Sequence, residues 1–308
     1  MKIIFMGTPE FAIPSLQILL DNSYDVQAVV TVPDKPQGRG RKLLPAPVKK
    51  FAMEKNLKIL QPEKLDDMNF LQELKRLTPD IIVVVAFRIL PEAVYMLPKY
   101  GSFNLHPSLL PKYRGPAPIN WAIINGEKET GVTTFFLQEK VDSGGIILQK
   151  KIEIGIDDTA GELQKKLSYL GAQAVLESVR LIESGNVVVV PQDEMNACYA
   201  PKIFKDGCRI DWKKSAYDIH NFVRGLSPEP TAWTTHKGKI LKIYRTKFIE
   251  AGSAGNPGAI FHKSKNLLEV NTGNGILSIL EIQQEGRRRL GIEEFLRGYK
   301  MEEGEILC

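Results

Sequence analysis

Residues 79–87 read PDIIVVVAF, and this stretch decides which fold to expect. Its middle is apolar without a break and lacks the alternation typical of a strand with one wet face, so it predicts a strand buried on both faces. The segments KIIFMG (2–7) and DVQAVVTV (25–32) have the same character. Helix-like stretches such as FAIPSLQILLDN (11–22) and MNFLQELKRL (68–77) lie between them. Strands alternating with helices predict an α/β fold with a doubly wound, mainly parallel sheet.

The sequence changes in texture after residue 190. The stretch VVVVPQDEMNACYAPKIFKDG (187–207) is typical of an extended linker. Short strands separated by Gly and Asn follow, at KGKILKIYRTKFIE (237–250), GAIFHKS (258–264) and LLEVNTGNGILSILEIQQEGRRR (267–289). This spacing predicts a small β-barrel or sandwich. We therefore expect a catalytic domain at 1–190, a linker at 191–206 and a β-domain at 207–308.

Length and composition exclude several classes of protein. A chain of 308 residues is long for one core, so two domains are expected. No apolar run has the length of a membrane span, and the N-terminus lacks a signal peptide's apolar region. Cys198, Cys208 and Cys308 include no Cys-x-x-Cys pair, which favours free thiols in a reducing cytoplasm over a disulfide frame or a metal site. We expect a cytoplasmic protein with no metal and no membrane partner.

Basic residues gather in two places, although the net charge is only +5. Residues 207–308 contain 16 Lys and Arg against 12 Asp and Glu, and residues 34–50 contain six basic residues against Asp34 alone. A polyanionic partner and a solubilising surface both explain this pattern.

The turn after the first strand argues against a dinucleotide cofactor. It reads GTPEFA (7–12), not Gly-x-Gly-x-x-Gly. Pro9 occupies the region where glycines would let the backbone approach a pyrophosphate.

The strongest chemical signal is the pair Asn104 and His106 within GSFNLHPSLLPKYRG (101–115). Residues two apart on a strand point to one face, and open α/β sheets bind ligands at the carboxyl ends of their strands. An amide and an imidazole there can stabilise an oxyanion as a carbonyl becomes tetrahedral. A surface histidine beside a capping asparagine is the simpler alternative.

Asp142, in QEKVDSGGIIL (138–148), is the candidate third member of this site. An Asp before two glycines is usually only a turn former. If sheet order brings it beside His106, it can orient the ring and raise the pKa of His106. The chain has no Gly-x-Ser-x-Gly elbow, so the pattern favours acyl transfer between two bound substrates, one of which supplies the nucleophile.

These motifs resemble a known family. NLHPSLLPKYRGPAPI (104–119) and DSGGIIL (142–148) are similar to the formyltransferases that use 10-formyltetrahydrofolate. Within that group, FMGTPEFA (5–12), PDKPQGRGRKL (33–43), KDGCRIDW (205–212) and FLRGYK (295–300) resemble the methionyl-tRNA formyltransferases, and the likeness covers essentially the full chain.

The resemblance implies a Rossmann-like domain followed by a β-barrel resembling an open OB fold. It implies Asn104, His106 and Asp142 as the catalytic set, with Asn104 and a protonated His106 stabilising the oxyanion. The formyl donor would be 10-formyltetrahydrofolate, and the acceptor would be the methionine α-amino group of initiator methionyl-tRNA. A monomer is expected.

The resemblance also implies the folate contacts. The family's Ser-Leu-Leu-Pro stretch lines the folate site and corresponds here to Ser108, Leu109, Leu110 and Pro111. One stretch departs: many members read Ala-Tyr-Gly-x-Ile-Leu-Pro, whereas this chain reads AFRILP (86–91), one residue shorter. The shorter form is similar to glycinamide ribonucleotide formyltransferase, whose Arg-Ile-Leu backbone contacts the pterin. That contact is carried onto Arg88, Ile89 and Leu90.

For the tRNA, the resemblance implies that an inserted loop enters the acceptor stem. Arg39 would be its main contact, with Arg41 and Lys42 beside it. A basic side of the β-domain would contact tRNA phosphates. Its candidate residues are Arg209, Lys213, Lys214, Arg224, Lys237, Lys239, Lys242, Arg245 and Lys247.

Three alternatives remain at this point. Nucleotide amino-sugar N-formyltransferases carry a related second domain and are the main one. Glycinamide ribonucleotide formyltransferase resembles only the N-terminal part. A tRNA-binding module without catalysis is the third, and the intact Asn104, His106 and Asp142 argue against it.

Overall fold

The computed structural model describes residues 1–37, 42–250 and 255–308, and these residues form two compact units. Unit 1 comprises residues 1–115, 130–152 and 164–199, and unit 2 comprises residues 116–129, 153–163 and 200–308. The residues predicted as a linker are therefore divided between the units at position 199. Two earlier segments also belong to unit 2, and backbone hydrogen bonds join each of them to residues 200–308: Ala117 N donates to Ala200 O (3.2 Å) and Gly161 N donates to Ser227 O (3.0 Å).

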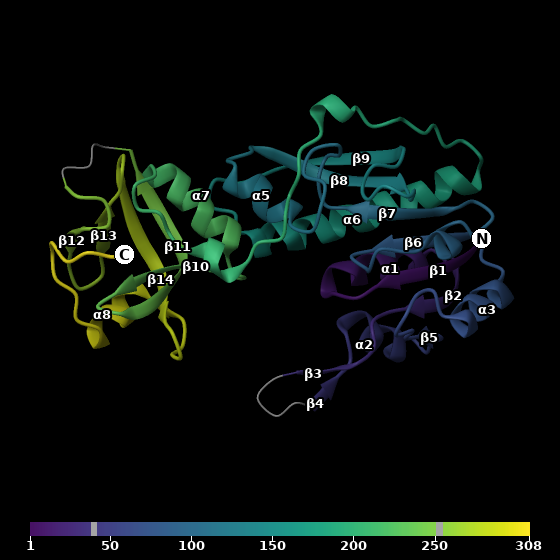
Figure 1. The fold of residues 1–308 in the computed structure, drawn as a ribbon, viewed down its shortest axis with the longest axis horizontal. Helices are drawn as coiled ribbons and strands as arrows, with labels where there is room; N and C mark the ends of the chain where they lie inside the picture. The colour runs from purple at the N-terminus through teal and green to yellow at the C-terminus, as the bar shows by residue number, and fades with distance from the viewer. Residues whose placement is uncertain (38–41, 251–254) are drawn as a thin grey trace. The chain divides into compact units, whose positions relative to one another are not determined.

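Unit 1 is built on a seven-stranded sheet with the order β5-β2-β1-β6-β7-β8-β9 (Figure 1). Its neighbours from β5 to β7 pair in parallel, and β8 runs antiparallel to β7. The predicted doubly wound, mainly parallel sheet is thus confirmed. Its strands are β1 (Lys2–Gly7), β2 (Asp25–Val30), β5 (Ile59–Leu60), β6 (Ile81–Val85), β7 (Ser102–His106), β8 (Glu129–Phe136) and β9 (Ile146–Glu153).

The unbroken apolar run of β6 follows from burial on both faces. Ile82 and Val84 pack with α3 (Met68–Leu77) and α4 (Glu92–Tyr95) in one hydrophobic cluster. The alternate residues of β6, Ile81, Val83 and Val85, point to the opposite face and are also fully buried. On β7 that opposite face packs against α6 (Ala160–Glu183): a Cβ added at Gly171 would lie 2.6 Å from Leu105 Cδ2.

The chain builds this sheet outward from its centre in both directions. It runs from β1 to β2 and β5 on one side, through α1 (Ile13–Asp21) and α2 (Pro47–Glu54), and then to β6, β7, β8 and β9 on the other. The carboxyl ends of β1, β6 and β7 therefore lie along one edge, at Gly7, Val85 and His106. Polar residues at these ends are placed to share one site.

A short ribbon interrupts the β2–α2 connection. Strand β3 (Lys35–Gln37) pairs antiparallel with β4 (Lys42–Leu44), with Gln37 opposite Lys42. The base of the ribbon is held by Asp34, which bonds to Lys49 Nζ at 2.6 Å and to Gln61 Nε2 at 2.9 Å. The basic segment predicted as a loop thus begins and ends in paired strands.

Unit 2 contains an antiparallel sheet with the order β10-β11-β14-β13-β12, and β15 pairs with β14. Apolar residues of α7 and α8 pack on its inner face. Register shifts around Arg245 mark a bulge in the long strand β11. The elements are α5 (Pro118–Ile124), α7 (Ala216–Leu226), β10 (Ala232–His236), β11 (Lys239–Ile249), β12 (Ile260–Lys263), β13 (Leu268–Asn271), β14 (Ile276–Gln284), β15 (Leu290–Gly291) and α8 (Ile292–Gly298).

The last residues of the chain close this sheet into a barrel. Thr235 of β10 exchanges two backbone hydrogen bonds with Cys308, at 2.7 and 2.9 Å. Leu307 donates to the Gly258 carbonyl at 2.8 Å, beside the start of β12, and its side chain is buried in the core. The terminal segment therefore links the two ends of the strand order, and the predicted β-barrel is confirmed.

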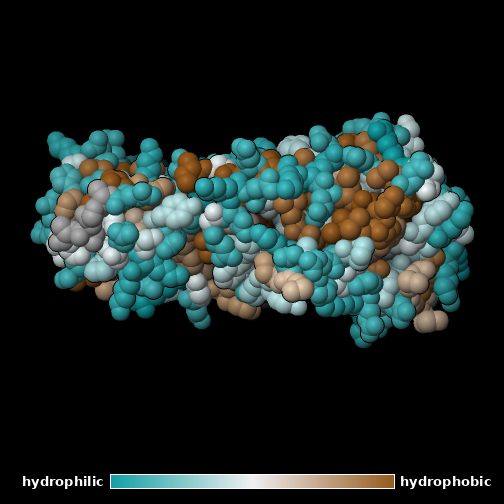
Figure 2. Space-filling model, turned by 90° about the horizontal axis from the view of Figure 1, so that it is seen from above, coloured by the Kyte–Doolittle hydropathy of each residue, from teal (hydrophilic) through white to brown (hydrophobic). Residues whose placement is uncertain are grey.

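The surface in Figure 2 is mostly hydrophilic, with hydrophobic residues gathered in part of the face shown. Among the large exposed hydrophobic residues are Val188 and Met195, at 76% and 96% exposure, both after α6. In the described part of the chain, every helix is too short or too polar to cross a membrane.

Candidate active site

Strand β7 presents two of the predicted catalytic residues on one face. Leu105 points to α6, so Asn104 and His106 point to the opposite face of the sheet. His106 is 4% exposed, whereas Asn104 is half-buried. Within the described residues the Asn104 side chain makes no hydrogen bond, so its amide remains available to a ligand.

Among the described residues, one ring nitrogen of His106 forms a hydrogen bond and the other forms none. Nε2 lies 2.8 Å from the carbonyl oxygen of Tyr113. Because a carbonyl only accepts, Nε2 carries the proton in this contact. Nδ1 lies 3.8 Å from Asp142 Oδ2, beyond hydrogen-bonding distance but within strong electrostatic reach. The structure thus brings Asp142 beside His106, and Asp142 Oδ2 accepts from the Gly115 N–H at 2.9 Å.

The protonation state of His106 reflects two opposing effects. Burial lowers the pKa of His106 below its ordinary value, and the Asp142 charge and the Tyr113 carbonyl act against that effect. Asp142 does raise the pKa, as the sequence suggested, but burial outweighs it. The resting ring is neutral at pH 7, with a lone pair on Nδ1.

The loop after β7 is fixed by side chains of the neighbouring strands. Thr133 Oγ1 donates to Ser108 O (2.7 Å) and accepts from Leu110 N (3.0 Å). Gln149 Nε2 donates to Leu110 O at 2.8 Å, and the Leu110–Pro111 peptide is cis. Of the predicted folate residues here, Ser108 and Leu110 are buried, and Leu109 and Pro111 are half-buried.

The turn that carries Asp142 has an unusual backbone. Asp142 has a φ of 54°, in the left-handed region that non-glycine residues rarely adopt. A Cβ at Gly144 would lie 1.7 Å from the Phe136 carbonyl oxygen, so only glycine fits at that position. Such a backbone persists where surrounding contacts over-determine it.

The second predicted folate segment follows β6. The Arg88 side chain is already used, because Nη1 donates to Glu63 O and Nη2 to Pro62 O, both at 2.8 Å. Leu90 is buried and Ile89 is 75% exposed. In the described residues no hydrogen bond involves the backbone N–H or C=O of Arg88, Ile89 or Leu90. Any recognition here would use the backbone and the Ile89 side chain.

The predicted tRNA residues are only partly described. Arg39 and Arg41 lie outside the described residues, and Lys42 begins β4.

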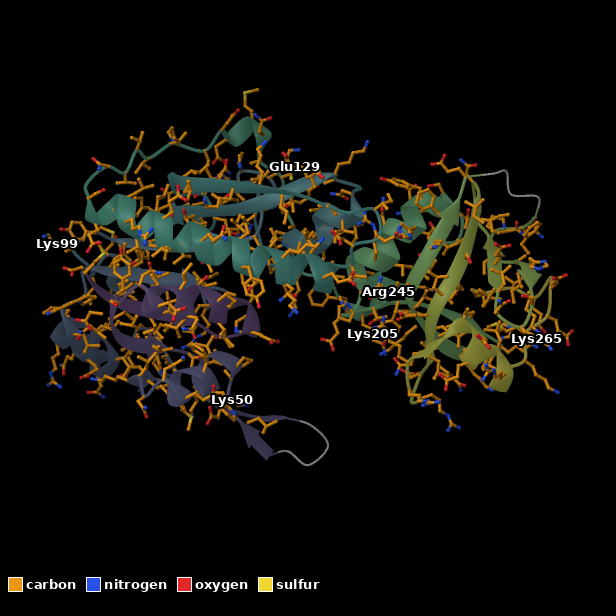
Figure 3. The ribbon with its side chains drawn as sticks, turned by 180° about the vertical axis from the view of Figure 1, so that it is seen from behind. Lys50, Lys99, Glu129, Lys205, Arg245 and Lys265 are labelled. Atoms are coloured by element: carbon orange, nitrogen blue, oxygen red, sulfur yellow. The ribbon has the colours of Figure 1, made fainter. Side chains whose placement is uncertain are left out.

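Three of the predicted basic contacts in unit 2 pair with groups of the protein itself, and one of them, Lys237, bonds to Glu305. Arg224 is 4% exposed and donates from Nη1 to the carbonyls of Gly155 and Asp158, both at 3.1 Å. This arginine is therefore a core residue, and its prediction as a surface contact was wrong. Arg245, labelled in Figure 3, pairs with Glu162 and Glu281. Exposed members of the set are Arg209, Lys213, Lys214, Lys237, Lys239 and Lys247.

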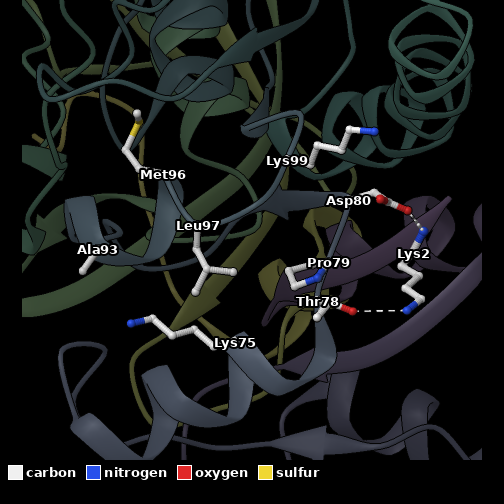
Figure 4. A pocket seen from close by; sticks show the side chains of 9 residues that line it. All are labelled: Lys2, Lys75, Thr78, Pro79, Asp80, Ala93, Met96, Leu97 and Lys99. Carbon is white, nitrogen blue, oxygen red and sulfur yellow. Dashed lines mark hydrogen bonds between the residues drawn. The ribbon is translucent and has the colours of Figure 1, made fainter.

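A hollow lies at the amino ends of β1, β6 and β7, the ends opposite to Gly7, Val85 and His106. Its volume is about 760 Å³, and its lining includes Lys2, Thr78 and Asp80 (Figure 4). Lys2 Nζ donates to Thr78 Oγ1 at 3.1 Å there. Ligands of open α/β sheets bind at the carboxyl ends, so this hollow is not the candidate site. Across the described ranges, no group of three His, Cys, Asp or Glu could hold a metal ion.

Sequence reasoning missed the residues that surround the Asp142 turn. Gln192 and Glu194 come from the predicted linker, and both bond to the guanidinium of Arg114, which is 2% exposed. Cys198 Sγ accepts from the Tyr113 N–H at 3.2 Å. No local pattern marks these residues, because their partners lie far away in the chain.

Comparison with known proteins shows similarity along the whole chain. Residues 1–179 match the family model described as "Formyl transferase", and residues 202–300 match "Formyl transferase, C-terminal domain". A methionyl-tRNA formyltransferase of Caldanaerobacter subterraneus subsp. tengcongensis is 50% identical, with all of both chains covered. One of Alkaliphilus oremlandii is 47% identical over all of this chain and 99% of its own.

Solved structures share the fold at lower identity. The sugar 3N-formyltransferase WlaRD, solved in the presence of dTDP and 5-N-formyl-THF, has a TM-score of 0.68 at 24% identity, covering 94% of this chain and 99% of its own. HypX from Aquifex aeolicus, in complex with tetrahydrofolic acid, has a TM-score of 0.67 at 20% identity, covering 99% of this chain and 50% of its own.

Proposed function

The chain belongs to the methionyl-tRNA formyltransferase family, and from this premise we propose that it transfers the formyl group of 10-formyltetrahydrofolate to the α-amino group of methionine on initiator methionyl-tRNA. The observation that carries the proposal is the environment of His106. Among the described residues its Nδ1 has no hydrogen bond and lies beside the Asp142 carboxylate, and the Asn104 amide, likewise without a hydrogen bond there, projects from the same face of β7.

The chemistry follows from these three side chains. Bound 10-formyltetrahydrofolate supplies the formyl carbon, and the methionine amine is the nucleophile. Neutral His106 accepts the proton that the amine loses, through Nδ1, and its imidazolium then donates to the oxygen that becomes negative. The Asn104 amide N–H is the second donor to that oxygen. The Asp142 charge stabilises the imidazolium. His106 finally gives its proton to N10 of the folate, as the bond between N10 and the formyl carbon breaks and the new bond to the methionine nitrogen remains.

Backbone groups without hydrogen bonds in the described residues support a folate site at Arg88, Ile89 and Leu90. A pterin is a flat ring with hydrogen-bond donors and acceptors on its edge, and this segment offers unpaired backbone groups beside an exposed apolar side chain. The segment leaves β6, the strand next to β7, at its carboxyl end. The loop Ser108–Pro111 leaves β7 at the same edge of the sheet, and we include it in the proposed folate site.

The β3–β4 ribbon supports a tRNA contact. Lys35 and Lys42 belong to its strands, and Arg39 and Arg41 belong to the segment that connects them. The planar fork of Arg can grip a phosphate bidentately, which Lys cannot. We propose Arg39 as the main contact to the acceptor stem, with Arg41 and Lys42 adding charge.

One assay tests the acceptor. Transfer of a labelled formyl group from 10-formyltetrahydrofolate is offered separately to methionyl-tRNA, to a nucleotide amino-sugar and to glycinamide ribonucleotide. We expect rapid transfer to methionyl-tRNA alone. Faster transfer to the amino-sugar would replace this proposal with the main alternative.

The tRNA contact needs its own test. Arg39→Ala should raise the KM for methionyl-tRNA more than Arg39→Lys does. Both increases in KM, relative to wild type, should become smaller as the salt concentration rises, because screening weakens a phosphate contact in the wild type too. The KM for the folate should not change. Wild-type kinetics for Arg39→Ala at low salt would remove this contact.

A further inference from the structure

Gln192 connects the two segments that carry His106 and Asp142. Its Nε2 donates to the backbone carbonyls of Asp142 (3.0 Å) and Gly144 (2.9 Å), within one turn. Its Oε1 accepts from Arg114 Nε at 3.1 Å and Nη2 at 2.7 Å. One side chain thus uses its whole hydrogen-bonding capacity to join the Asp142 turn to the loop after β7.

Arg114 lies between the residues that hold the two catalytic side chains. The residue before it, Tyr113, accepts the hydrogen bond of His106, and the residue after it, Gly115, donates to the Asp142 carboxylate. The guanidinium is 2% exposed, so it needs partners to offset the loss of water. Gln192 is one partner.

Glu194 is the other partner and joins the same two segments from outside. Its oxygens accept from Arg114 at 2.8 and 3.1 Å and from Lys140 Nζ at 2.9 Å. Lys140 stands at the start of the Asp142 turn. Because Glu194 is exposed and Gln192 is half-buried, the Gln192 amide is the less replaceable of the two contacts.

The Asp142 turn requires such support. Its left-handed φ of 54° is unfavourable for an aspartate, and the Gln192 amide pairs two of the turn's carbonyl oxygens at once. Without that amide, both carbonyls would lose a partner, and the turn could relax toward ordinary backbone angles. The carboxylate would then leave its place in front of His106 Nδ1.

We propose that Gln192, together with Arg114, is a positioning residue that holds the Asp142 carboxylate against His106. Neither residue touches the reacting atoms, and the inference rests on the proposed function because it assigns them a role through Asp142. The segment after α6 thereby sets the geometry of the catalytic pair.

A double-mutant cycle tests this role. Gln192→Met keeps the length of the side chain and removes all four hydrogen bonds. We expect kcat to fall roughly 10- to 100-fold with both KM values little changed, since a misplacement of about 1 Å can cost about 10²-fold. The variant Gln192→Met/Asp142→Asn should be no slower than Asp142→Asn alone, because both changes remove the same interaction. Met195→Ala, at a side chain that is 96% exposed in the same segment, should behave like wild type.

The outcomes separate this inference from the proposed function. If Asp142→Asn keeps wild-type turnover, the catalytic assignment itself fails. If Asp142→Asn lowers kcat but Gln192→Met does not, only the positioning role is overturned. The same holds if the fold-reduction in kcat of the double variant equals the product of the two single reductions. Should Gln192→Met not fold, Gln192→Asn enters the same cycle, because it keeps an amide that is one methylene too short for the turn.

Discussion

His106 of unit 1 and His220 of unit 2 have similar surroundings but differ in how many of their ring nitrogens form hydrogen bonds. Both are almost completely buried, at 4% and 2% exposure, and burial lowers the pKa of each. Each has a carboxylate oxygen 3.8 Å from a ring nitrogen, from Asp142 and from Asp157. On burial, charge and distance alone, the two histidines would be assigned the same role.

Their hydrogen bonds separate them. His220 uses both nitrogens, at 3.0 Å from Thr246 Oγ1 and 3.0 Å from the Ile156 carbonyl. Within the described part of the chain, His106 forms a hydrogen bond through Nε2 alone, and its Nδ1 faces a carboxylate that accepts from a backbone N–H. A buried histidine with both nitrogens paired holds the fold together. A buried histidine with one nitrogen free retains a group for chemistry, at some cost in stability.

The largest expected effect is the loss of activity when His106 is removed. His106→Ala should lower kcat about 10²- to 10³-fold, as for other oxyanion donors. The free energy of unfolding should also fall, by roughly 1–3 kcal/mol, because the change removes one hydrogen bond and opens a cavity, so kcat is compared at 25 °C in folded protein. Steady-state formyl transfer and urea unfolding measure the two quantities. Wild-type turnover in this variant would show that the free nitrogen has no catalytic use.

The reciprocal change should reverse the pattern. His220→Ala leaves Thr246 and the Ile156 carbonyl without a partner and opens a cavity, so unit 2 should lose roughly 2–4 kcal/mol of stability. Since Trp121, Trp212 and Trp233 all belong to unit 2, tryptophan fluorescence reports its unfolding alone. The kcat at 25 °C should remain that of wild type. A marked loss of kcat with normal stability would contradict the structural role.

A smaller effect should distinguish the two carboxylates. Asp142 raises the pKa of His106, so Asp142→Asn lets burial lower that pKa further. Because transfer requires neutral His106, the acid limb of kcat/KM should move to lower pH in whatever activity remains. Asp157 is 63% exposed and faces a histidine without a catalytic role, so Asp157→Asn should leave the limb in place. Equal shifts in both variants would remove Asp142 from its assigned role.

The smallest expected effect concerns the pH dependence of stability. The folded pKa of His220 lies below its ordinary value of 6.5, so the unfolded chain binds the proton more readily. This contribution to stability is fully present above about pH 6.5 and decreases as the pH falls toward the folded pKa. His220→Gln keeps polar atoms but cannot titrate, and should flatten the slope of unit 2 unfolding below pH 6.5. An unchanged slope would place the titration elsewhere.

Local patterns were sufficient for most elements. The N-cap of α6 follows from adjacent residues: Thr159 and Glu162 exchange hydrogen bonds at 2.9 and 3.3 Å, and Gly185 ends the segment with a φ of 71°. Helix α7 was overlooked although its signals are equally local. Ser215 caps it through a bond from the Asp218 N–H at 3.1 Å, and Ile219 and Val223 recur at helical spacing.

Arg224 illustrates where charge misleads. A basic residue in a basic domain suggested a surface contact, yet the guanidinium is enclosed and bonds to backbone carbonyls of the loop before α6. No sequence feature within a few residues of Arg224 predicts its contacts with those carbonyls. Its burial depends on segments that the fold brings together from distant parts of the chain.

The sequence by itself determined the strands of the sheet and the common face of Asn104 and His106, because side-chain direction along a strand alternates with a period of two residues and needs no distant partner. It also determined the family of the chain, because the motifs that carry the resemblance are short and continuous in the sequence. The tertiary structure alone decided that Asp142 faces Nδ1, that Gln192 joins the two segments, and that His106 keeps a free nitrogen while His220 does not. These relations join residues far apart in the chain. Their distances depend on strand order and on the path of the chain after α6, and no local pattern encodes either.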